Sequence, residues 1–74
     1  MRSRRERQEM QRCSGLFIRE LSWQDRRNVM RRLAYHLKRA GYWGDELSDS
    51  MSIAREGRYL DVVSAIDEMR SMGK

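Results

Sequence analysis

The sequence predicts a small all-α protein, a bundle of three or four helices with a basic N-terminal arm. Its 74 residues include no proline, no threonine and no Asn-Gly or Asp-Gly turn, and apolar and polar residues do not alternate over any long stretch. Strand and hairpin signals are therefore almost absent, whereas apolar residues recur three and four positions apart, the spacing of one helix face. A chain of this length forms one domain at most and buries only ~60% of the surface of its unfolded state, so the core is thin.

The first 21 residues contain one apolar stripe. Its spacing predicts a helix over about residues 4–20, in which Gly15 is a weak point that costs ~1 kcal/mol. A shorter helix that begins at Ser14, preceded by a disordered arm, is the alternative. The stripe consists of Met10, Cys13, Phe17 and Leu21.

The N-terminus itself is strongly basic. Because like charges repel one another and few apolar side chains are present there, we expect residues 1–9 to form a flexible arm without fixed structure of its own. Residues 10–74 then form the helical core of the same single domain. The arginines of the arm are Arg2, Arg4, Arg5 and Arg7.

Residues 22–40 form the strongest helical segment. Ser22 is suited to cap its N-terminus, Asp25 completes a capping-box-like pair, and Gly41 can end the helix in a left-handed conformation. At 100° per residue one arc of this helix is apolar and is predicted to face the core, while the opposite arc is almost purely basic. The apolar arc consists of Trp23, Val29, Met30, Leu33, Ala34, Leu37 and Ala40.

Two further helices are predicted beyond the Gly-Tyr-Trp-Gly break at residues 41–44. The first runs roughly over residues 45–56, with acids near its start and Gly57 after its end. The second runs over residues 59–72 and is acidic outside its apolar stripe. That stripe consists of Tyr59, Val62, Val63, Ala65, Ile66 and Met69.

The apolar stripes also predict how the helices pack. We expect segment 22–40 to pack against segment 59–72, the short helix between them to close one end, and residues 10–21 to cover the remaining apolar surface. Tyr42 and Trp43 are expected to lie over the end of this small core, because aromatic side chains bury much area and the chain has few others.

Charge is unevenly distributed along the chain. Residues 1–39 carry twelve basic and four acidic residues, a net charge of +8, whereas the remaining residues carry four basic and seven acidic ones, a net charge of −3. Fourteen of the 16 basic residues are arginine, whose planar guanidinium binds phosphate or carboxylate through two parallel hydrogen bonds. The asymmetry indicates an anionic partner for the first half of the chain.

The basic arm and the outer face of segment 22–40 are the candidate binding surface. Tyr35 has Arg31 and Arg39 one turn on either side, a position suited to stacking on an unpaired base or to anchoring in a protein pocket. We interpret the chain as a non-enzymatic basic protein that acts stoichiometrically, without a cofactor, on nucleic acid or a nucleic-acid-handling complex. The candidate residues are Arg4, Arg5, Arg7, Arg27, Arg31, Arg32, Tyr35, Lys38 and Arg39.

The same residues allow other interpretations. A protein–protein regulator or inhibitor would use them to dock on an acidic surface of a larger enzyme such as RNA polymerase or a nuclease. Otherwise the charges form a solvated helix face, with Tyr35 packed under the N-terminal segment. In a further alternative, the basic segment 22–40 faces the acidic segment 59–72 within the fold or across a homodimer, which a core this small would favour.

Other classes of protein fit the sequence poorly. One cysteine, Cys13, and one histidine, His36, provide neither an internal disulfide nor a four-ligand zinc site. Catalysis is not expected, because His36 is the only base for neutral pH and no glycine-rich phosphate loop is present. In a helix-turn-helix, segment 45–56 would place acids where a recognition helix needs Arg, Lys, Asn or Gln.

Membrane association is not expected either. No apolar run exceeds three residues, as in Leu16-Phe17-Ile18, which is far shorter than a signal-peptide core or a membrane span. We therefore expect a cytoplasmic protein. The free thiol of Cys13 fits a reducing compartment and is interpreted as a small, half-buried apolar residue.

Overall fold

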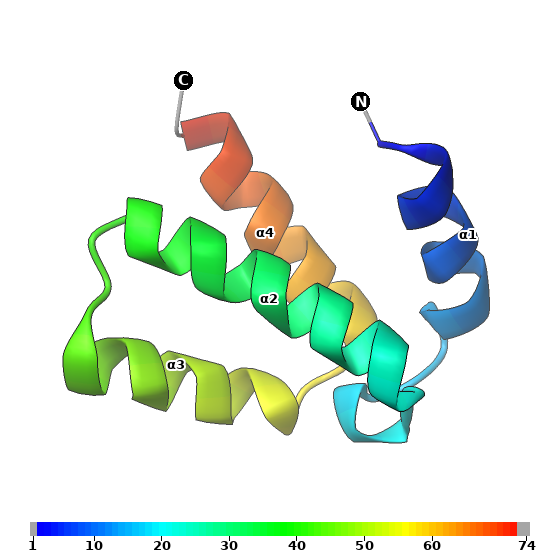
Figure 1. Ribbon diagram of the computed structural model, residues 1–74, viewed down its shortest axis with the longest axis horizontal. Coiled ribbons are helices and arrows are strands. Elements are labelled where there is room, and N and C mark those ends of the chain that lie inside the picture. Colours follow the sequence, from blue (N-terminus) through cyan, green and yellow to red (C-terminus); the bar gives the residue numbers. More distant parts are fainter. Residues whose placement is uncertain (1, 73–74) are drawn as a thin grey trace.

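The structure, a computed structural model, describes residues 2–72, and these form four α-helices and one short 3₁₀ helix (Figure 1). In chain order the elements are α1 (Arg4–Cys13), η1 (Ile18–Glu20), α2 (Trp23–Arg39), α3 (Gly44–Arg55) and α4 (Tyr59–Met72). Residues 2–72 contain no strand, and Phe17 and Arg58 form an isolated β-bridge. The prediction of a small all-α bundle is confirmed.

Helix α1 begins where we expected a flexible arm, and that prediction is wrong for residues 3–9. Ser3 caps the helix, because its Oγ accepts a hydrogen bond from the backbone N–H of Glu6 at 3.2 Å. Glu9, farther along the helix, is buried. Met1, the first residue of the expected arm, lies outside the described residues. Repulsion among the arginines is therefore offset by contacts with other helices.

Helix α1 ends at Cys13 and does not continue to residue 20. Ser14 lies at its C-terminal cap, where its backbone N–H donates to the Met10 carbonyl, so the alternative of a helix beginning at Ser14 is also wrong. The chain then turns into η1, at whose start the Glu20 carboxylate accepts a hydrogen bond from the Phe17 N–H at 2.8 Å. The apolar stripe of the first 21 residues is thus divided between two elements.

Helix α2 begins and ends as its sequence predicts, except that the Asp25 carboxylate binds Arg12 and does not complete a capping box. The Ser22 Oγ accepts a hydrogen bond from the Asp25 N–H at 3.2 Å, and Gly41 has a φ of 99°, the left-handed conformation that glycine adopts without strain. Two residues of the expected apolar arc are exposed, however. Trp23 and Ala40 stand at the two ends of the helix, beyond the reach of the helices packed against its middle.

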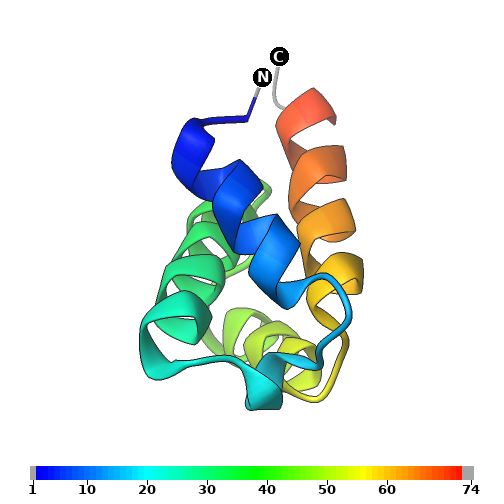
Figure 2. The same ribbon diagram turned by 90° about the vertical axis from the view of Figure 1, so that its right-hand side faces the viewer.

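The core lies mainly between α2 and α4, which run along each other as predicted (Figure 1), and Cys13 of α1 and Ile18 of η1 complete it. Figure 2 shows α1 on one side of this pair. Ala65 is the member of the expected α4 stripe that proves exposed. Tyr59 and Val29 are completely buried. The full core consists of Cys13, Ile18, Leu21, Val29, Met30, Leu33, Leu37, Tyr59, Val62, Val63 and Ile66.

Helix α3 is the least buried element. Its apolar residues that pack against the core, Leu47, Met51 and Ala54, are only partly buried, and the helix contributes no fully buried side chain. Trp43 does not cover the core, because it remains 64% exposed. Tyr42 is less exposed and lies beside the core residues Leu33 and Leu37, with which it lines a groove. None of the helices within residues 2–72 has the length and apolarity needed to cross a membrane.

Candidate nucleic-acid interface

The outer face of α2 carries no acidic side chain. Its exposed residues are four cations, two amides and two aromatics, and the single acid of the helix, Asp25, is turned inward and buried. A face of this composition attracts anions without local compensation. We call it the α2 face; its residues are Trp23, Gln24, Arg27, Asn28, Arg31, Tyr35, Lys38 and Arg39.

The cations of the α2 face are not consumed by internal ion pairs. Among residues 2–72, the paired acids of α1 and α4 bind Arg2, Arg32 and Arg70 instead, and Asp25 of α2 pairs with Arg12. The alternative in which the basic face of α2 lies against acidic α4 within the fold is therefore wrong. Positive charge on this face remains open to an external anion.

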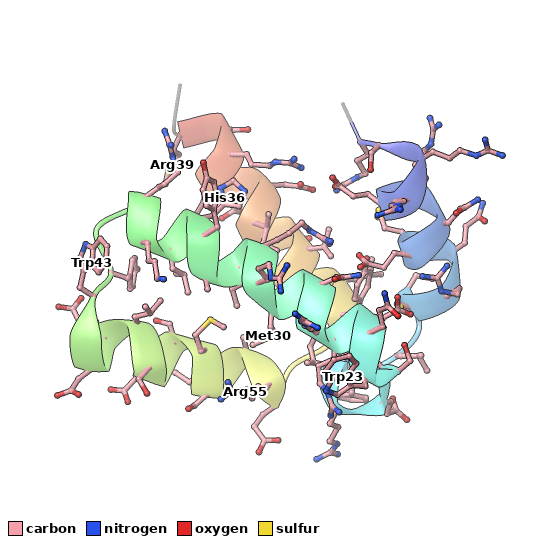
Figure 3. All side chains as sticks on the ribbon, viewed as in Figure 1. Trp23, Met30, His36, Arg39, Trp43 and Arg55 are labelled. Atoms are coloured by element: carbon pink, nitrogen blue, oxygen red, sulfur yellow. The ribbon has the colours of Figure 1, made fainter. Side chains whose placement is uncertain are left out.

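Five residues of the α2 face form a single row with a spacing of four: Trp23, Arg27, Arg31, Tyr35 and Arg39. Residues four apart lie along one ridge of a helix, so aromatic and guanidinium groups follow each other along α2. Figure 3 shows Trp23 and Arg39 at opposite ends of the helix. At 1.5 Å per residue the two aromatics stand about 18 Å apart along the axis.

Each aromatic of this row is paired with the arginine one turn later. The guanidinium carbon of Arg27 lies 5.2 Å from the centre of the Trp23 ring, and that of Arg39 lies 5.7 Å from the centre of the Tyr35 ring. The Arg39 guanidinium also donates to the Tyr35 hydroxyl at 3.3 Å. Tyr35 is 55% exposed, so the alternative in which it packs under the N-terminal segment is wrong.

The half-buried His36 contacts the exposed Tyr35 ring. The two rings meet edge to face with their centres 5.1 Å apart. Partial burial, followed by the nearby charges of Arg70 and Arg39, lowers the pKa of His36 below its ordinary value, so the ring is neutral at pH 7. This half-buried position confirms that His36 is a boundary residue of α2.

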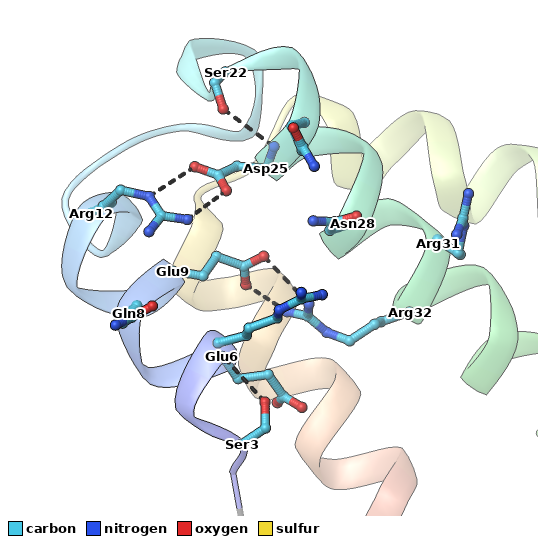
Figure 4. Close-up of a pocket in the computed structure, with 12 residues that line it drawn as sticks. Ser3, Glu6, Gln8, Glu9, Arg12, Ser22, Asp25, Asn28, Arg31 and Arg32 are labelled. Carbon is cyan, nitrogen blue, oxygen red and sulfur yellow. Dashed lines mark hydrogen bonds and ion pairs between the residues drawn. The ribbon is translucent and has the colours of Figure 1, made fainter.

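A polar groove of about 650 Å³ separates the α2 face from α1 (Figure 4). Arg31 and Asn28 line it from α2, and Arg5 and Gln8 line it from α1. Arg5 is thus the one arginine of the expected arm that the structure brings to the groove. Arg4 and Arg7 are exposed on other sides of α1 and lie apart from it.

Two buried carboxylates form part of the groove wall, and internal partners neutralise both. Glu9 accepts hydrogen bonds from the Tyr59 hydroxyl at 2.6 Å and from the Arg32 guanidinium at 2.7 and 3.3 Å. Arg32 is therefore half-buried in an ion pair, and the prediction that it lies on the open basic face is wrong. We call Glu9, Arg32 and Tyr59 the Glu9 cluster.

The second buried carboxylate, Asp25, joins the other end of α1 to α2. It accepts two hydrogen bonds from the Arg12 guanidinium, at 2.8 and 3.3 Å, and lies 3.5 Å from the Cys13 Sγ. The hydrogen bond from Arg12 lowers the pKa of Asp25, whereas burial and then the charge of Asp25 raise the pKa of the Cys13 thiol to about 11. Cys13 is accordingly a protonated core residue at neutral pH.

Comparisons of this chain with protein-family models, with curated proteins and with solved structures find no match. The function must therefore be inferred from the arrangement of its side chains.

Sequence reasoning missed two parts of this region. Trp23 was assigned to the core, although its spacing of four from Arg27 could have placed it on the row of the α2 face. The Glu9 cluster was not anticipated. Its signal was the position of Glu9 four residues before Cys13, on the inner side of α1, together with a core tyrosine whose hydroxyl needs a hydrogen-bond partner.

Proposed function

We propose that this protein binds nucleic acid through the α2 face and acts by occupying it, with no catalytic step of its own. The observation that carries the proposal is the row of two aromatic and three arginine side chains on a helix face that has no acid. The free thiol of Cys13 suits action in the reducing cytoplasm.

The cations supply affinity that does not depend on sequence. Arg27, Arg31, Lys38 and Arg39, with Arg5 across the groove, present five positive charges to a sugar–phosphate backbone. Each neutralised phosphate releases condensed counterions, so binding weakens as salt concentration rises. Gln24 and Asn28 add hydrogen-bonding amides that contact sugars, phosphates or base edges.

The aromatics favour a single strand over a duplex. Trp23 and Tyr35 are both exposed aromatic side chains, and unpaired bases stack on such rings with a contribution of ~1–3 kcal/mol per base. A duplex exposes no base faces along its length. The arginine beside each ring adds a cation that meets the neighbouring phosphate or stacks on the same base.

Fluorescence anisotropy with labelled oligonucleotides tests this proposal. The protein is titrated into a single strand and into a duplex at several salt concentrations. We expect tighter binding to the single strand and a log–log salt slope of about −3 to −4, that is ~0.7 for each of five neutralised phosphates.

Three variants locate the surface. Arg31→Gln should reduce the magnitude of the salt slope by ~0.7, the contribution of one neutralised phosphate. Tyr35→Ala should weaken single-strand binding by ~1–3 kcal/mol without loss of helical content. Arg55→Gln, which removes an exposed arginine from α3, is the matched control and should change neither. Absence of binding at low salt would refute the proposal and favour docking on an acidic protein surface.

A further inference from the structure

A second groove, of about 550 Å³, lies between α3 and α4. The two helices diverge from their connection at residues 56–58 (Figure 1), and inward-facing residues of α2, Leu33 and Leu37, form part of the floor. Val62 and Met69 line it from α4. The groove is therefore a continuation of the hydrophobic core that α3 leaves uncovered.

Large apolar side chains remain open to solvent at its edges. Ile53 of α3 is 74% exposed and Met72 of α4 is 76% exposed, and both line the groove. Ala65 of α4 also lines the groove, and its side chain is too small to fill it. Single exposed apolar residues are common on protein surfaces, but a contiguous apolar patch continuous with the core is a feature of binding surfaces.

The charges at this groove have the opposite sign to those of the α2 face. Two acids, Asp61 and Glu68, line it, and no basic residue within residues 2–72 does so, in a chain where bases outnumber acids. Asp49 stands one helical turn before Ile53 on the same side of α3. An occupant that matches these edges combines apolar side chains with flanking cations.

We propose that the α3–α4 groove binds an amphipathic helix of another protein, one whose apolar stripe is flanked by lysine or arginine. A helix fits better than an extended strand, because residues 2–72 present no sheet edge to which a strand could add. Apolar side chains spaced three and four apart would enter between Ile53 and Met69, and the flanking cations would meet Asp61 and Glu68.

A second copy of this chain is a poorer occupant. In a two-fold dimer the same patch faces itself, which would set Asp61 and Glu68 opposite the same acids. Helix α2 combines apolar and basic faces, but its apolar face is buried in its own core. The complementary helix must therefore come from a different protein.

The floor of the groove includes Leu33 and Leu37, which face inward from α2, whereas the α2 face points outward. The two surfaces approach each other at one end, where Met69 and Met72 also line a cavity with Tyr35 and Arg39. The proposal for the groove stands independently of nucleic-acid binding, and the two together would make the protein an adaptor between a helix and an anionic polymer.

Two matched synthetic peptides of about 14 residues, roughly four helical turns, test the proposal. Both have leucines at helical spacing, and the remaining positions are lysine in one and glutamate in the other. Each is titrated into the full-length, ¹⁵N-labelled protein and followed by amide chemical shifts. We expect the lysine peptide to shift amides around Ile53, Ala65 and Met69, and the glutamate peptide to leave them unchanged.

Variants of exposed apolar residues separate the groove from the rest of the surface. Ile53→Asp should weaken binding of the lysine peptide at least tenfold, because an isoleucine is no longer buried. Leu60→Asp is the matched control, since Leu60 is also exposed but lies outside the groove, and it should have no effect. If Ile53→Asp does not fold, Ile53→Ala combined with Met72→Ala gives the same comparison.

Three results would overturn the proposal. The two peptides could bind equally, the shifts could map away from α3 and α4, or Ile53→Asp and Leu60→Asp could weaken binding to the same degree. Groove amides that shift with protein concentration alone would assign the groove to a second copy and also overturn it. Nucleic-acid binding measured on Ile53→Asp is expected to be unchanged, so failure at the groove is distinguishable from failure at the α2 face.

Discussion

Replacement of Glu9 by glutamine should weaken the attachment of α1 to the bundle. The Glu9 side chain is nearly isosteric with glutamine, and its carboxylate is surrounded by donors, the Tyr59 hydroxyl and the two nitrogens of Arg32. A glutamine amide presents its own N–H groups where a second acceptor is required. One donor then loses its partner in a site where Glu9 is only 4% exposed.

The expected loss of stability is about 2–3 kcal/mol. Breaking a buried ion pair costs ~3–5 kcal/mol, but the Arg32 side chain is 26% exposed, so water compensates part of that cost. A chain of this size has a free energy of unfolding of roughly 4–11 kcal/mol, at ~0.05–0.15 kcal/mol per residue. The single substitution therefore removes a substantial fraction of the total.

Urea unfolding followed by far-UV circular dichroism measures this loss. Tyr59→Phe, which removes one hydrogen bond to the same carboxylate at constant ring volume, should cost ~1–2 kcal/mol. Glu68→Gln is the matched control at an exposed site of α4 and should change the free energy by less than ~0.5 kcal/mol. If Glu9→Gln is as neutral as Glu68→Gln, the Glu9 cluster does not anchor α1 and the reasoning is refuted.

Three further predictions follow from the contacts at the start of α2 and the end of α1. Ser22→Ala should lower the free energy of unfolding by ~1 kcal/mol through loss of the N-cap, measured by urea unfolding, whereas Ser22→Asn should retain most of it. Since the pKa of Asp25 is lower in the folded state, its contribution is present above the unfolded pKa of ~3.9 and is lost as pH falls through the folded value. Acid titrations should therefore show a shallower decline in stability for Asp25→Asn than for the unmodified protein, and equal declines would contradict the ion pair with Arg12. Cys13, with a pKa of about 11 and almost no exposure, should react with a thiol reagent at mildly alkaline pH only after denaturation, so rapid labelling of the native protein would show that α1 opens readily.

Much of the fold is readable from local patterns. The cap at Ser22, the left-handed Gly41 and the bounds of α4 all follow from interactions within a few residues, which sequence spacing reports directly. The basic composition of the α2 face likewise follows from the positions of its residues on a helical wheel. Most of the candidate cations on this helix are exposed for that reason.

The remainder depends on contacts between distant residues. The order of α1 comes from Glu9 meeting Tyr59, fifty positions away in sequence, and periodicity carries no information about such a pair. Arg32 was placed on the open face because the helical wheel puts it on the arc opposite the apolar stripe, and only the position of α1 decides that it is covered. Trp23 is exposed for a similar reason, because no neighbouring helix within residues 2–72 covers the start of α2.

The ion pairs between the start of α1 and the end of α4 have a further consequence for the chain's connectivity. Arg2 pairs with Asp67 and Arg70 pairs with Glu6, so the start of α1 lies within ion-pair reach of the last turns of α4. A short linker could therefore join them, and the chain could be reopened at the exposed turn near Tyr42 with little change in the bundle. The same geometry suits insertion of the whole domain into a surface loop of a host protein, with the Tyr35–Arg39 end of the α2 face close to the junction, because both residues line a cavity with Met72.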